Sequence, residues 1–188
     1  DAEAFDTPLG RVMLDTDAIH AITYLPQVVV SGAAHVQEHS LEVQLPFLQS
    51  ILEDFSLLPL AVGMATAEEV AEVLEAVWGG GETLIVISSD LSHYLPYAIA
   101  QSVDHKTTQS ILNLHQLSSH DQACGATPVN GLILAARKHH LKPHLLDLRH
   151  DVARSAFLAK PVEVPRTRSE RGNEQARHRV VLRLVVDR

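Results

Sequence analysis

Cysteine, aromatic residues and long apolar runs are scarce in this sequence, and each scarcity argues against a class of protein. Cys124 is the single cysteine in 188 residues, so no disulfide can form within the chain and nothing indicates an oxidising compartment. Aromatic residues make up only 4%, which argues against an aromatic-rich all-β shell. No apolar run approaches the roughly 20 residues of a membrane span, and no secretory signal opens the sequence. We therefore expect a cytoplasmic protein without a membrane partner.

The composition that is present favours one globular domain over residues 1–188. The chain is 46% hydrophobic and 20% charged, and at this length it can bury one sizeable core. Its plentiful aliphatic residues suit helices packed on a sheet. A net charge of −8 argues against nucleic acid as the main partner, because that partner requires a basic face that displaces counterions.

Apolar segments alternate with amphipathic segments from Ser56 onward, which is typical of a layered α/β domain. The stretch Thr83–Ser88 is apolar on both faces, as expected of a central strand that is covered on each side. Three further strands are expected at 56–62, 144–148 and 180–186. Helices are expected after a capping box at 66–69, over about 98–117 and from about 127 to 139.

Two helix starts can be predicted from the residues that begin them. Ser40 is a candidate N-cap for a helix that buries leucines, with Pro46 kinking it. Thr127 is a candidate N-cap for the later helix, because Pro128 would then occupy the first helical position. The arginine-rich segment within 161–179 has almost no apolar residues, so we expect a flexible, solvated loop there.

The segment SSDLSHY at 88–94 places polar side chains at the carboxyl end of a buried strand, where ligands bind in open α/β sheets. Asp90 and His93 are three residues apart, so both could point into one pocket if the chain turns there. A carboxylate beside an imidazole orients the ring, as a general base or a metal ligand requires. Alternatively, Asp90 and Ser92 cap the next helix and His93 is a packed surface residue.

Cys124 lies a few residues before a predicted helix, where the helix dipole and free amides favour a thiolate. This thiol could be a metal ligand, a nucleophile or a redox-sensitive group. Equally, it could be a small buried hydrophobic residue.

Glu38 and His39 stand just before the helix predicted from Ser40, where side chains can face a cleft. The alternative is that Glu38 only meets the positive end of the helix dipole. The other histidines, His35 and His120 among them, show no ligand spacing such as HxxxH. The sequence contains no P-loop, GxGxxG or GxSxG motif, which argues against nucleotide binding and α/β-hydrolase chemistry.

Three long motifs occur together and in order: EHSLEVQLPFL at 38–48, SSDLSHY at 88–94 and CGATPVNGLILAARKH at 124–139. With TPLG at 7–10 and LLDLRH at 145–150, they resemble the Memo family, which includes the bacterial proteins called AmmeMemoRadiSam system protein B. The resemblance covers about residues 5–150. It implies an α/β fold similar to the class III extradiol dioxygenases, which use non-haem iron and a nearby histidine base.

The resemblance also implies roles for individual residues. Cys124 matches the family's metal-binding cysteine, His93 the histidine over the metal pocket, and Asp90 the carboxylate beside it. Glu38 and His39 match the Glu-His-Ser segment near the same cleft. A site with thiolate and imidazole ligands would suit iron or copper. The family's name implies an AMMECR-type protein and a radical SAM protein as partners, and the small-molecule substrate is unknown.

The resemblance also implies a stretch before TPLG that contains a Pro-His-Ala-Gly motif and a further histidine, which supply two metal ligands, and no counterpart precedes Thr7 here. We therefore expect a fold that lacks its N-terminal part. Three hypotheses follow: a metal-dependent redox enzyme of dioxygenase ancestry, a non-catalytic binding module, or a truncated inactive family member.

Overall fold

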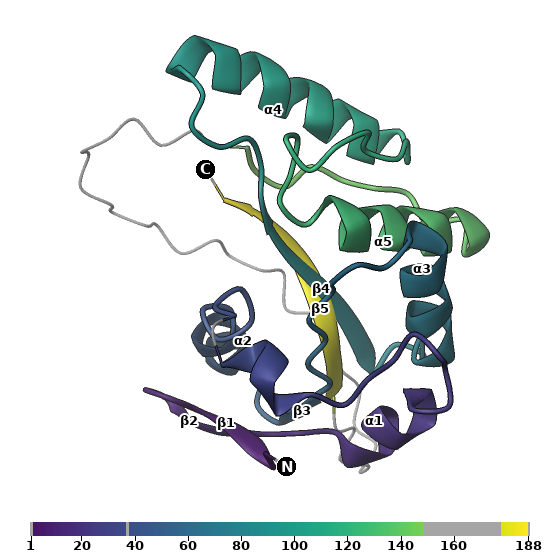
Figure 1. Cartoon of the computed structure of the whole chain (residues 1–188). Coiled ribbons are helices and arrows are strands. Elements are labelled where there is room, and N and C mark those ends of the chain that lie inside the picture. The colour runs from purple at the N-terminus through teal and green to yellow at the C-terminus, as the bar shows by residue number, and fades with distance from the viewer. Residues whose placement is uncertain (1, 37, 149–177, 188) are drawn as a thin grey trace, which may run out of the picture.

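A computed structural model describes residues 2–36 and 38–148 and the backbone of residues 178–187 (Figure 1). These ranges form a mixed α/β structure with a small sheet and flanking helices. The elements in chain order are β1 (Ala4–Thr7), β2 (Gly10–Met13), α1 (Thr16–Ile22), the 3₁₀ helix η1 (Gly32–His35), α2 (Leu45–Ile51), β3 (Phe55–Leu57), α3 (Ala67–Ala76), β4 (Thr83–Asp90), α4 (Tyr97–Leu112), α5 (Ala126–Lys138) and β5 (His178–Asp187).

The main sheet of the described residues is parallel and has the strand order β3-β5-β4. The strand predicted at 180–186 is confirmed as β5, which starts two residues earlier and lies between the other two strands. The central position predicted for Thr83–Ser88 is therefore wrong within the described ranges, where β4 pairs only with β5. A separate antiparallel hairpin joins β1 and β2.

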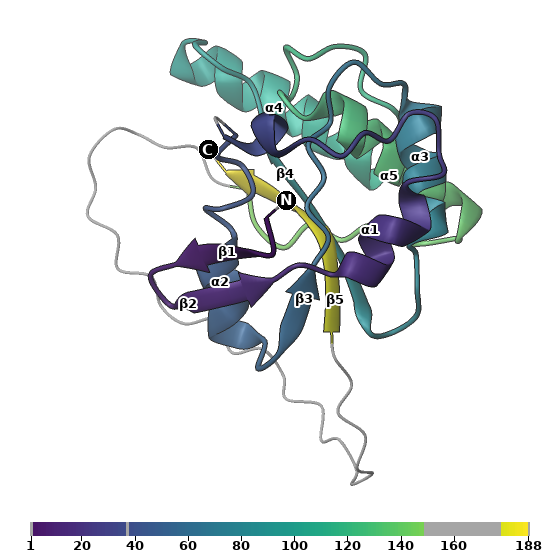
Figure 2. The same cartoon turned by 60° about the horizontal axis from the view of Figure 1, so that its bottom comes forward.

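Both faces of β4 are nevertheless covered, as its apolar sequence predicts. Val86 packs with core residues of β2, α2 and β3, while Ile87 packs with the core formed around α5. Successive side chains of a strand point to opposite faces, so neighbouring residues reach opposite layers. Figures 1 and 2 show α3 and α5 on one side of the β4–β5 pair and α2 with the β1–β2 hairpin on the other.

Helix α3 begins at the capping box predicted from the sequence. The Thr66 hydroxyl accepts a hydrogen bond from the Glu69 amide at 3.1 Å, and the Glu69 carboxylate accepts one from the Thr66 amide at 2.7 Å. Val70 faces α5, where Gly131 approaches so closely that a Cβ there would lie 2.6 Å from the Val70 Cβ. Glycine therefore sets the distance between these two helices.

The predicted helix start at Ser40 is wrong, because α2 begins at Leu45 and residues 40–44 form turns. Pro46 is the second residue of the helix and not a kink inside it. A proline is tolerated there because the first amide groups of a helix have no partner within the helix.

The predicted N-cap at Thr127 is also wrong, since Gly125 precedes the first residue of α5 and Thr127 is its second residue. The amides of Cys124 and Gly125 are bonded to β4 instead, which fixes where the helix can start. Similarly, α4 ends at Leu112, earlier than expected.

Two predicted strands differ from the structure. The strand expected at 56–62 is only the three-residue β3 at Phe55–Leu57, and Pro59, which has no amide hydrogen for a ladder, follows shortly after it. Residues 144–148 form no strand, and the side chain of Leu146 is 87% exposed, because these residues have no pairing partner among the described strands. Of the loop expected at 161–179, residues 161–177 lie outside the described ranges, and the remainder begins β5.

Among the described helices, none is both long and apolar enough to cross a bilayer.

Candidate functional site

The carboxyl end of β4 carries the polar segment that the sequence singled out. Ser88, Ser89 and Asp90 are the last three residues of the strand, so the polar side chains begin inside the sheet. Leu91 follows with 1% of its surface exposed and belongs to the core around α5. This buried leucine fixes the chain directly after the strand and directs the next residues back across the strand end.

Asp90 and His93 form the pair that their spacing predicted. The His93 Nε2 lies 3.2 Å from the Asp90 Oδ2, and both side chains are part-exposed, at 33% and 44%. A hydrogen bond of this kind decides which ring nitrogen carries the proton and holds the plane of the ring. The other nitrogen, Nδ1, is thereby directed away from the carboxylate. The pair can hold or move a proton at a fixed position.

Cys124 reaches the same strand end from 34 residues further along the chain. Its amide donates a hydrogen bond to the Asp90 carbonyl at 3.2 Å, and its Sγ accepts one from the Asp90 amide at 3.3 Å. The Ser89 hydroxyl lies 3.6 Å from the same sulfur. These contacts hold the Cys124 sulfur against the end of β4. The structure thus joins Cys124 to the backbone of Asp90 and His93 to the Asp90 carboxylate, without grouping the three side chains as ligands of one metal ion.

Ser89 and Gly125 make this approach possible, and sequence analysis identified neither as a site residue. The Gly125 amide donates to the Ser89 Oγ at 2.9 Å, and the hydroxyl of this serine donates to the Asp90 carbonyl at 2.8 Å. A Cβ on Gly125 would lie 2.8 Å from the Ser89 Cβ, so only glycine allows the loop to lie against β4 at this distance. A glycine directly after Cys124 is a sequence signal for a close backbone approach, whereas Ser89 carries no comparable signal.

Glu38 and His39 make local contacts and are not joined by a hydrogen bond or ion pair to the cluster around Asp90 in the described residues. The Glu38 carboxylate accepts the Ser40 amide at 2.6 Å, and hydrogen bonding from Ser40 holds the pKa of this carboxyl below its ordinary value. His39 Nδ1 lies 2.8 Å from the Glu42 carboxylate, and its side chain is exposed.

A different residue of the same motif reaches β4. The Gln44 side-chain amide donates to the Ser88 Oγ at 3.2 Å, which ties the segment before α2 to the end of the strand. The motif EHSLEVQLPFL therefore lies near the site, and Gln44 makes its direct contact. The sequence around Gln44 does not predict this role, because the contact joins segments that are 44 residues apart in the chain.

His120 is a second residue that sequence analysis left without a role. Its Nδ1 lies 3.0 Å from the Cys124 carbonyl, and its Nε2 lies 3.3 Å from the Thr127 hydroxyl. The ring thus bridges the loop before Cys124 and the first turn of α5. It supports the position of the cysteine backbone.

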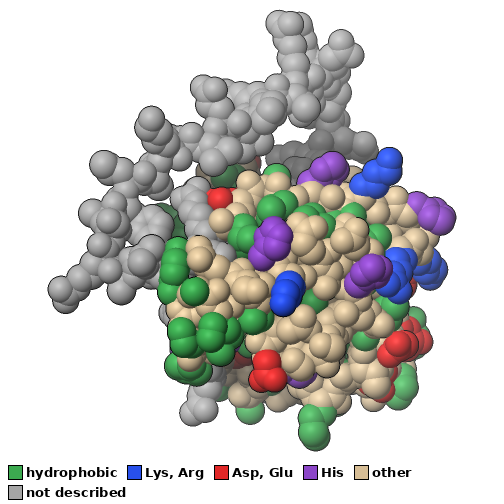
Figure 3. All heavy atoms as spheres, turned by 90° about the horizontal axis from the view of Figure 1, so that it is seen from above, with side chains coloured by type: hydrophobic (Ala, Val, Ile, Leu, Met, Phe, Trp, Pro, Cys, Tyr) green, Lys and Arg blue, Asp and Glu red, His purple; other side chains and the backbone are tan. Residues whose placement is uncertain are grey.

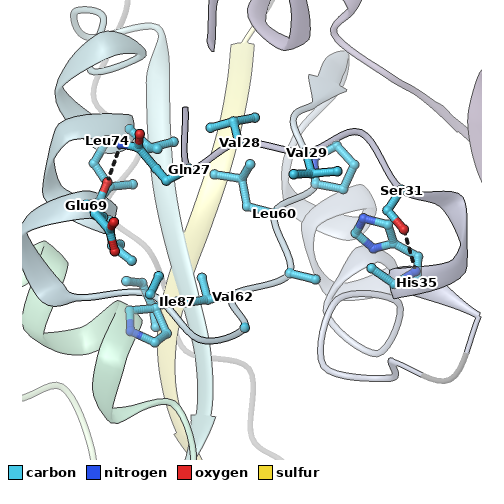
Figure 4. A pocket seen from close by; sticks show the side chains of 18 residues that line it. Gln27, Val28, Val29, Ser31, His35, Leu60, Val62, Glu69, Leu74 and Ile87 are labelled. Carbon is cyan, nitrogen blue, oxygen red and sulfur yellow. Dashed lines mark hydrogen bonds between the residues drawn. The ribbon is translucent and has the colours of Figure 1, made fainter. Parts of the chain in front are cut away.

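A small hollow of about 160 Å³ lies beside this region, between the loops at 27–35 and 59–65 and helix α3 (Figure 4). Its walls are mostly aliphatic, and the Gln27 side chain closes one side by donating to the Glu69 carbonyl at 3.3 Å. Ile87 of β4 lines it, whereas Asp90, His93 and Cys124 do not. The hollow is therefore separate from the cluster of predicted site residues.

Exposed apolar side chains follow the site directly. Tyr94, in a left-handed conformation with φ of 58°, is fully exposed, and Tyr97 and Ile99 are about half exposed. Figure 3 looks down on the side of α4 and shows hydrophobic side chains gathered at one border of that face. We name Tyr94, Leu95, Tyr97 and Ile99 the apolar patch.

The described residues do not by themselves complete a metal site. Within residues 2–36 and 38–148, no three or more His, Cys, Asp or Glu side chains are grouped so that they could hold a metal ion. The donor types at the end of β4, a thiol, a carboxylate and an imidazole, are ones that transition metals accept. These residues therefore supply at most part of a metal site.

Fold and site together define a mixed α/β protein with a cysteine and an aspartate–histidine pair at the carboxyl end of a parallel strand. The model of the family described as Memo-like protein matches residues 1–151, and the chain belongs to this family. None of the solved structures matched the chain.

Several archaeal relatives, each named MEMO1 family protein, are similar to this chain. The one from Metallosphaera sedula is 30% identical over 156 residues, which cover 76% of this chain and 55% of the relative. The one from Methanosarcina mazei is 35% identical over 150 residues, covering 72% and 55%. The one from Archaeoglobus fulgidus is 36% identical over 115 residues, covering 57% and 43%. The chain spans about half the length of these relatives.

Proposed function

We propose that this chain forms part of a metal-dependent redox site of dioxygenase ancestry that acts on an organic small molecule. In this proposal Cys124 binds iron or copper as a thiolate, and the pair of Asp90 and His93 serves as the acid–base group. The metal, when bound, would supply electron transfer to or from the substrate. The fold would share its layering with the class III extradiol dioxygenases, and the protein would work in the cytoplasm.

One observation carries the proposal: the Asp90 amide donates to the Cys124 sulfur while the Asp90 carboxylate bonds His93. A single residue thus links the thiol and the imidazole through its backbone and its side chain. A purely structural role would need no such link, because a buried cysteine packs as a small hydrophobe. Cys124 is exposed, so a ligand can reach it.

Each residue has a defined task. The Asp90 amide donates to the Cys124 sulfur and so holds it at the strand end, in position to bind the metal. The Asp90 carboxylate orients His93 so that one ring nitrogen faces the carboxylate and the other is free to exchange a proton with a substrate. Further metal ligands are expected from outside the described ranges, since these contain no group of three.

Metal binding can be tested on the single thiol. The protein is reconstituted anaerobically with iron(II) or copper(I), and metal per chain and thiolate-to-metal absorption are measured. We expect binding by the wild type, loss of both signals in Cys124→Ser, and no change in His105→Ala, which removes an exposed histidine of α4. Equal binding by Cys124→Ser and the wild type, or no binding by the wild type, would count against the proposal.

A second candidate function is a binding module in a system with an AMMECR-type protein and a radical SAM protein. The observation that favours it is the apolar patch beside a cluster that lacks three metal ligands in the described ranges. Co-purification of the tagged chain with each partner, repeated with Tyr94→Ser, tests it. Metal-dependent turnover without recovery of either partner would decide against this candidate.

A further inference from the structure

Helix α4 is held against the site by a buried carboxylate. The fully buried side chains of its described residues are all polar, namely Asp104, Thr107 and Thr108. Asp104 is 2% exposed and is the one acidic or basic residue among those described as buried. Burying a carboxylate is costly unless hydrogen bonds or charges compensate it, so its position requires a specific reason.

One partner of this carboxylate lies in the turn that carries His93. The Asp104 Oδ1 accepts a hydrogen bond from the Ser92 amide at 3.0 Å. This amide lies beyond the end of β4 and has no ladder partner, and a buried amide without a partner would be destabilising. The hydroxyl oxygen of Ser92 is itself buried without a hydrogen-bond partner in the described ranges, so the amide supplies the residue's polar link to α4.

The hydrogen bond between Ser92 and Asp104 fixes the chain between the two members of the acid–base pair, Asp90 and His93. Leu91 is fixed by burial, and Ser92 is fixed by Asp104, so the backbone between Asp90 and His93 is held at both intervening residues. The chain then turns through Tyr94, whose φ of 58° lies in the left-handed region. Asp104 therefore helps to hold His93 where its ring lies 3.2 Å from the Asp90 carboxylate.

We propose that Asp104 is a positioning residue: it fixes the turn from Leu91 to His93 and couples the placement of α4 to the geometry of the Asp90–His93 pair. Its meaning for activity depends on the function proposed above, whereas the geometry itself can be tested without a metal. A ligand or partner that shifts α4 would thereby change the position of the His93 ring.

The test uses hydrogen exchange of the Ser92 amide and the ¹⁵N chemical shifts of the His93 ring, both read by NMR in the complete chain. Asp104→Leu keeps the side-chain shape but removes the acceptor, and Asp104→Asn keeps an acceptor oxygen. Thr107→Val is the matched control, because Thr107 is buried on the same helix and its hydroxyl donates to the Val103 carbonyl of that helix.

We expect the Ser92 amide to exchange at least about tenfold faster in Asp104→Leu, which corresponds to the loss of a hydrogen bond of about 1.4 kcal/mol. The His93 ring signals should move as well. Asp104→Asn should restore both readouts, and Thr107→Val should leave both unchanged. Equal behaviour of Asp104→Leu and Thr107→Val would overturn the inference. So would an unprotected Ser92 amide in the wild type, a measurement that needs no variant to fold.

Failure of this inference differs from failure of the proposed function. Suppose that the wild type binds no metal, but its Ser92 amide is protected and the His93 signals shift in Asp104→Leu. The proposed function would then fail, and the positioning role of Asp104 would remain. Metal binding that depends on Cys124, together with an unprotected Ser92 amide, would leave the proposed site standing and remove Asp104 from it.

Discussion

Gly125 is the position where one added methyl group tests the geometry of the site most directly. A Cβ there would lie 2.8 Å from the Ser89 Cβ, 2.9 Å from its hydroxyl oxygen and 3.3 Å from the Ser88 carbonyl oxygen. Ordinary contacts begin near 3.4 Å, so the serine and the loop would have to separate by about 0.6 Å. Ser89 is buried in β4 and paired with β5, so it cannot move aside freely.

We therefore expect Gly125→Ala to lower the free energy of unfolding by about 1–3 kcal/mol, the usual cost of overpacking a well-packed region. Backbone strain contributes nothing, because φ at this residue is −88°, which alanine adopts readily. Urea denaturation followed by circular dichroism measures the change. Gly81→Ala is the matched control: nothing lies within 4 Å of its added Cβ, so its effect should stay within about 0.5 kcal/mol.

A double-mutant cycle identifies the partner in this clash. Ser89→Gly removes the two atoms that the new methyl group would approach most closely and leaves only the Ser88 carbonyl oxygen at 3.3 Å, so Gly125→Ala should cost much less in that background, with a coupling energy of about 1–2 kcal/mol. The reasoning is refuted if Gly125→Ala is as stable as Gly81→Ala, or if Ser89→Gly leaves the cost unchanged.

Three further predictions concern the scaffold. Gly131→Ala should destabilise the protein by about 1–2 kcal/mol in urea denaturation, because overpacking against Val70 outweighs the gain of roughly 1 kcal/mol in helix propensity. In a Val70→Gly background, which removes both Val70 atoms that the new Cβ would meet, the same change should cost much less, and an unchanged cost would contradict the assignment of this contact. Thr66→Ala should cost about 1 kcal/mol by breaking the capping box, whereas Thr66→Ser should retain most of the stability. The Lys138 ammonium holds the pKa of Glu75 below its ordinary value of 4.5, so this pair stabilises the fold above that pH and loses its contribution as the pH falls through the lowered pKa. The free energy of unfolding should therefore fall less between about pH 6 and pH 3 in Glu75→Gln than in the wild type, by up to about 1 kcal/mol. An equal fall in both proteins would show that this pair does not contribute to the loss of stability in acid.

The parts of the fold that the sequence predicts correctly depend on neighbouring residues. The capping box at Thr66–Glu69 and the apolar segment of β5 follow from local spacing and composition. The errors arise where tertiary contacts decide. Residues 40–44 form turns although Ser40 is predicted to cap a helix, and Gly125 replaces Thr127 before α5 because its amide bonds to β4. The sequence predicts the residues of β4 correctly, but it cannot predict the position of β4 in the strand order of the sheet.

The site divides in the same way. The spacing of Asp90 and His93 predicts their contact, because a short turn returns the chain to the strand end. That Cys124 meets Asp90 follows from the order of the sheet and α5, and only resemblance to a family connected the two from sequence. Ser89, Gln44 and Asp104 could not be identified, since each acts through a backbone or side-chain atom of a residue distant in the chain.

The place of β5 in the sheet has a consequence for how the protein is made. β5 lies between β3 and β4, yet it is translated about 90 residues after β4. At typical synthesis rates the ribosome needs about 5–18 s to cover that distance, and during this time the edges of β3 and β4 that β5 will occupy have no partner. Unpaired strand edges invite association with other chains, so the nascent polypeptide should depend on chaperones during this interval more than a protein whose neighbouring strands are consecutive.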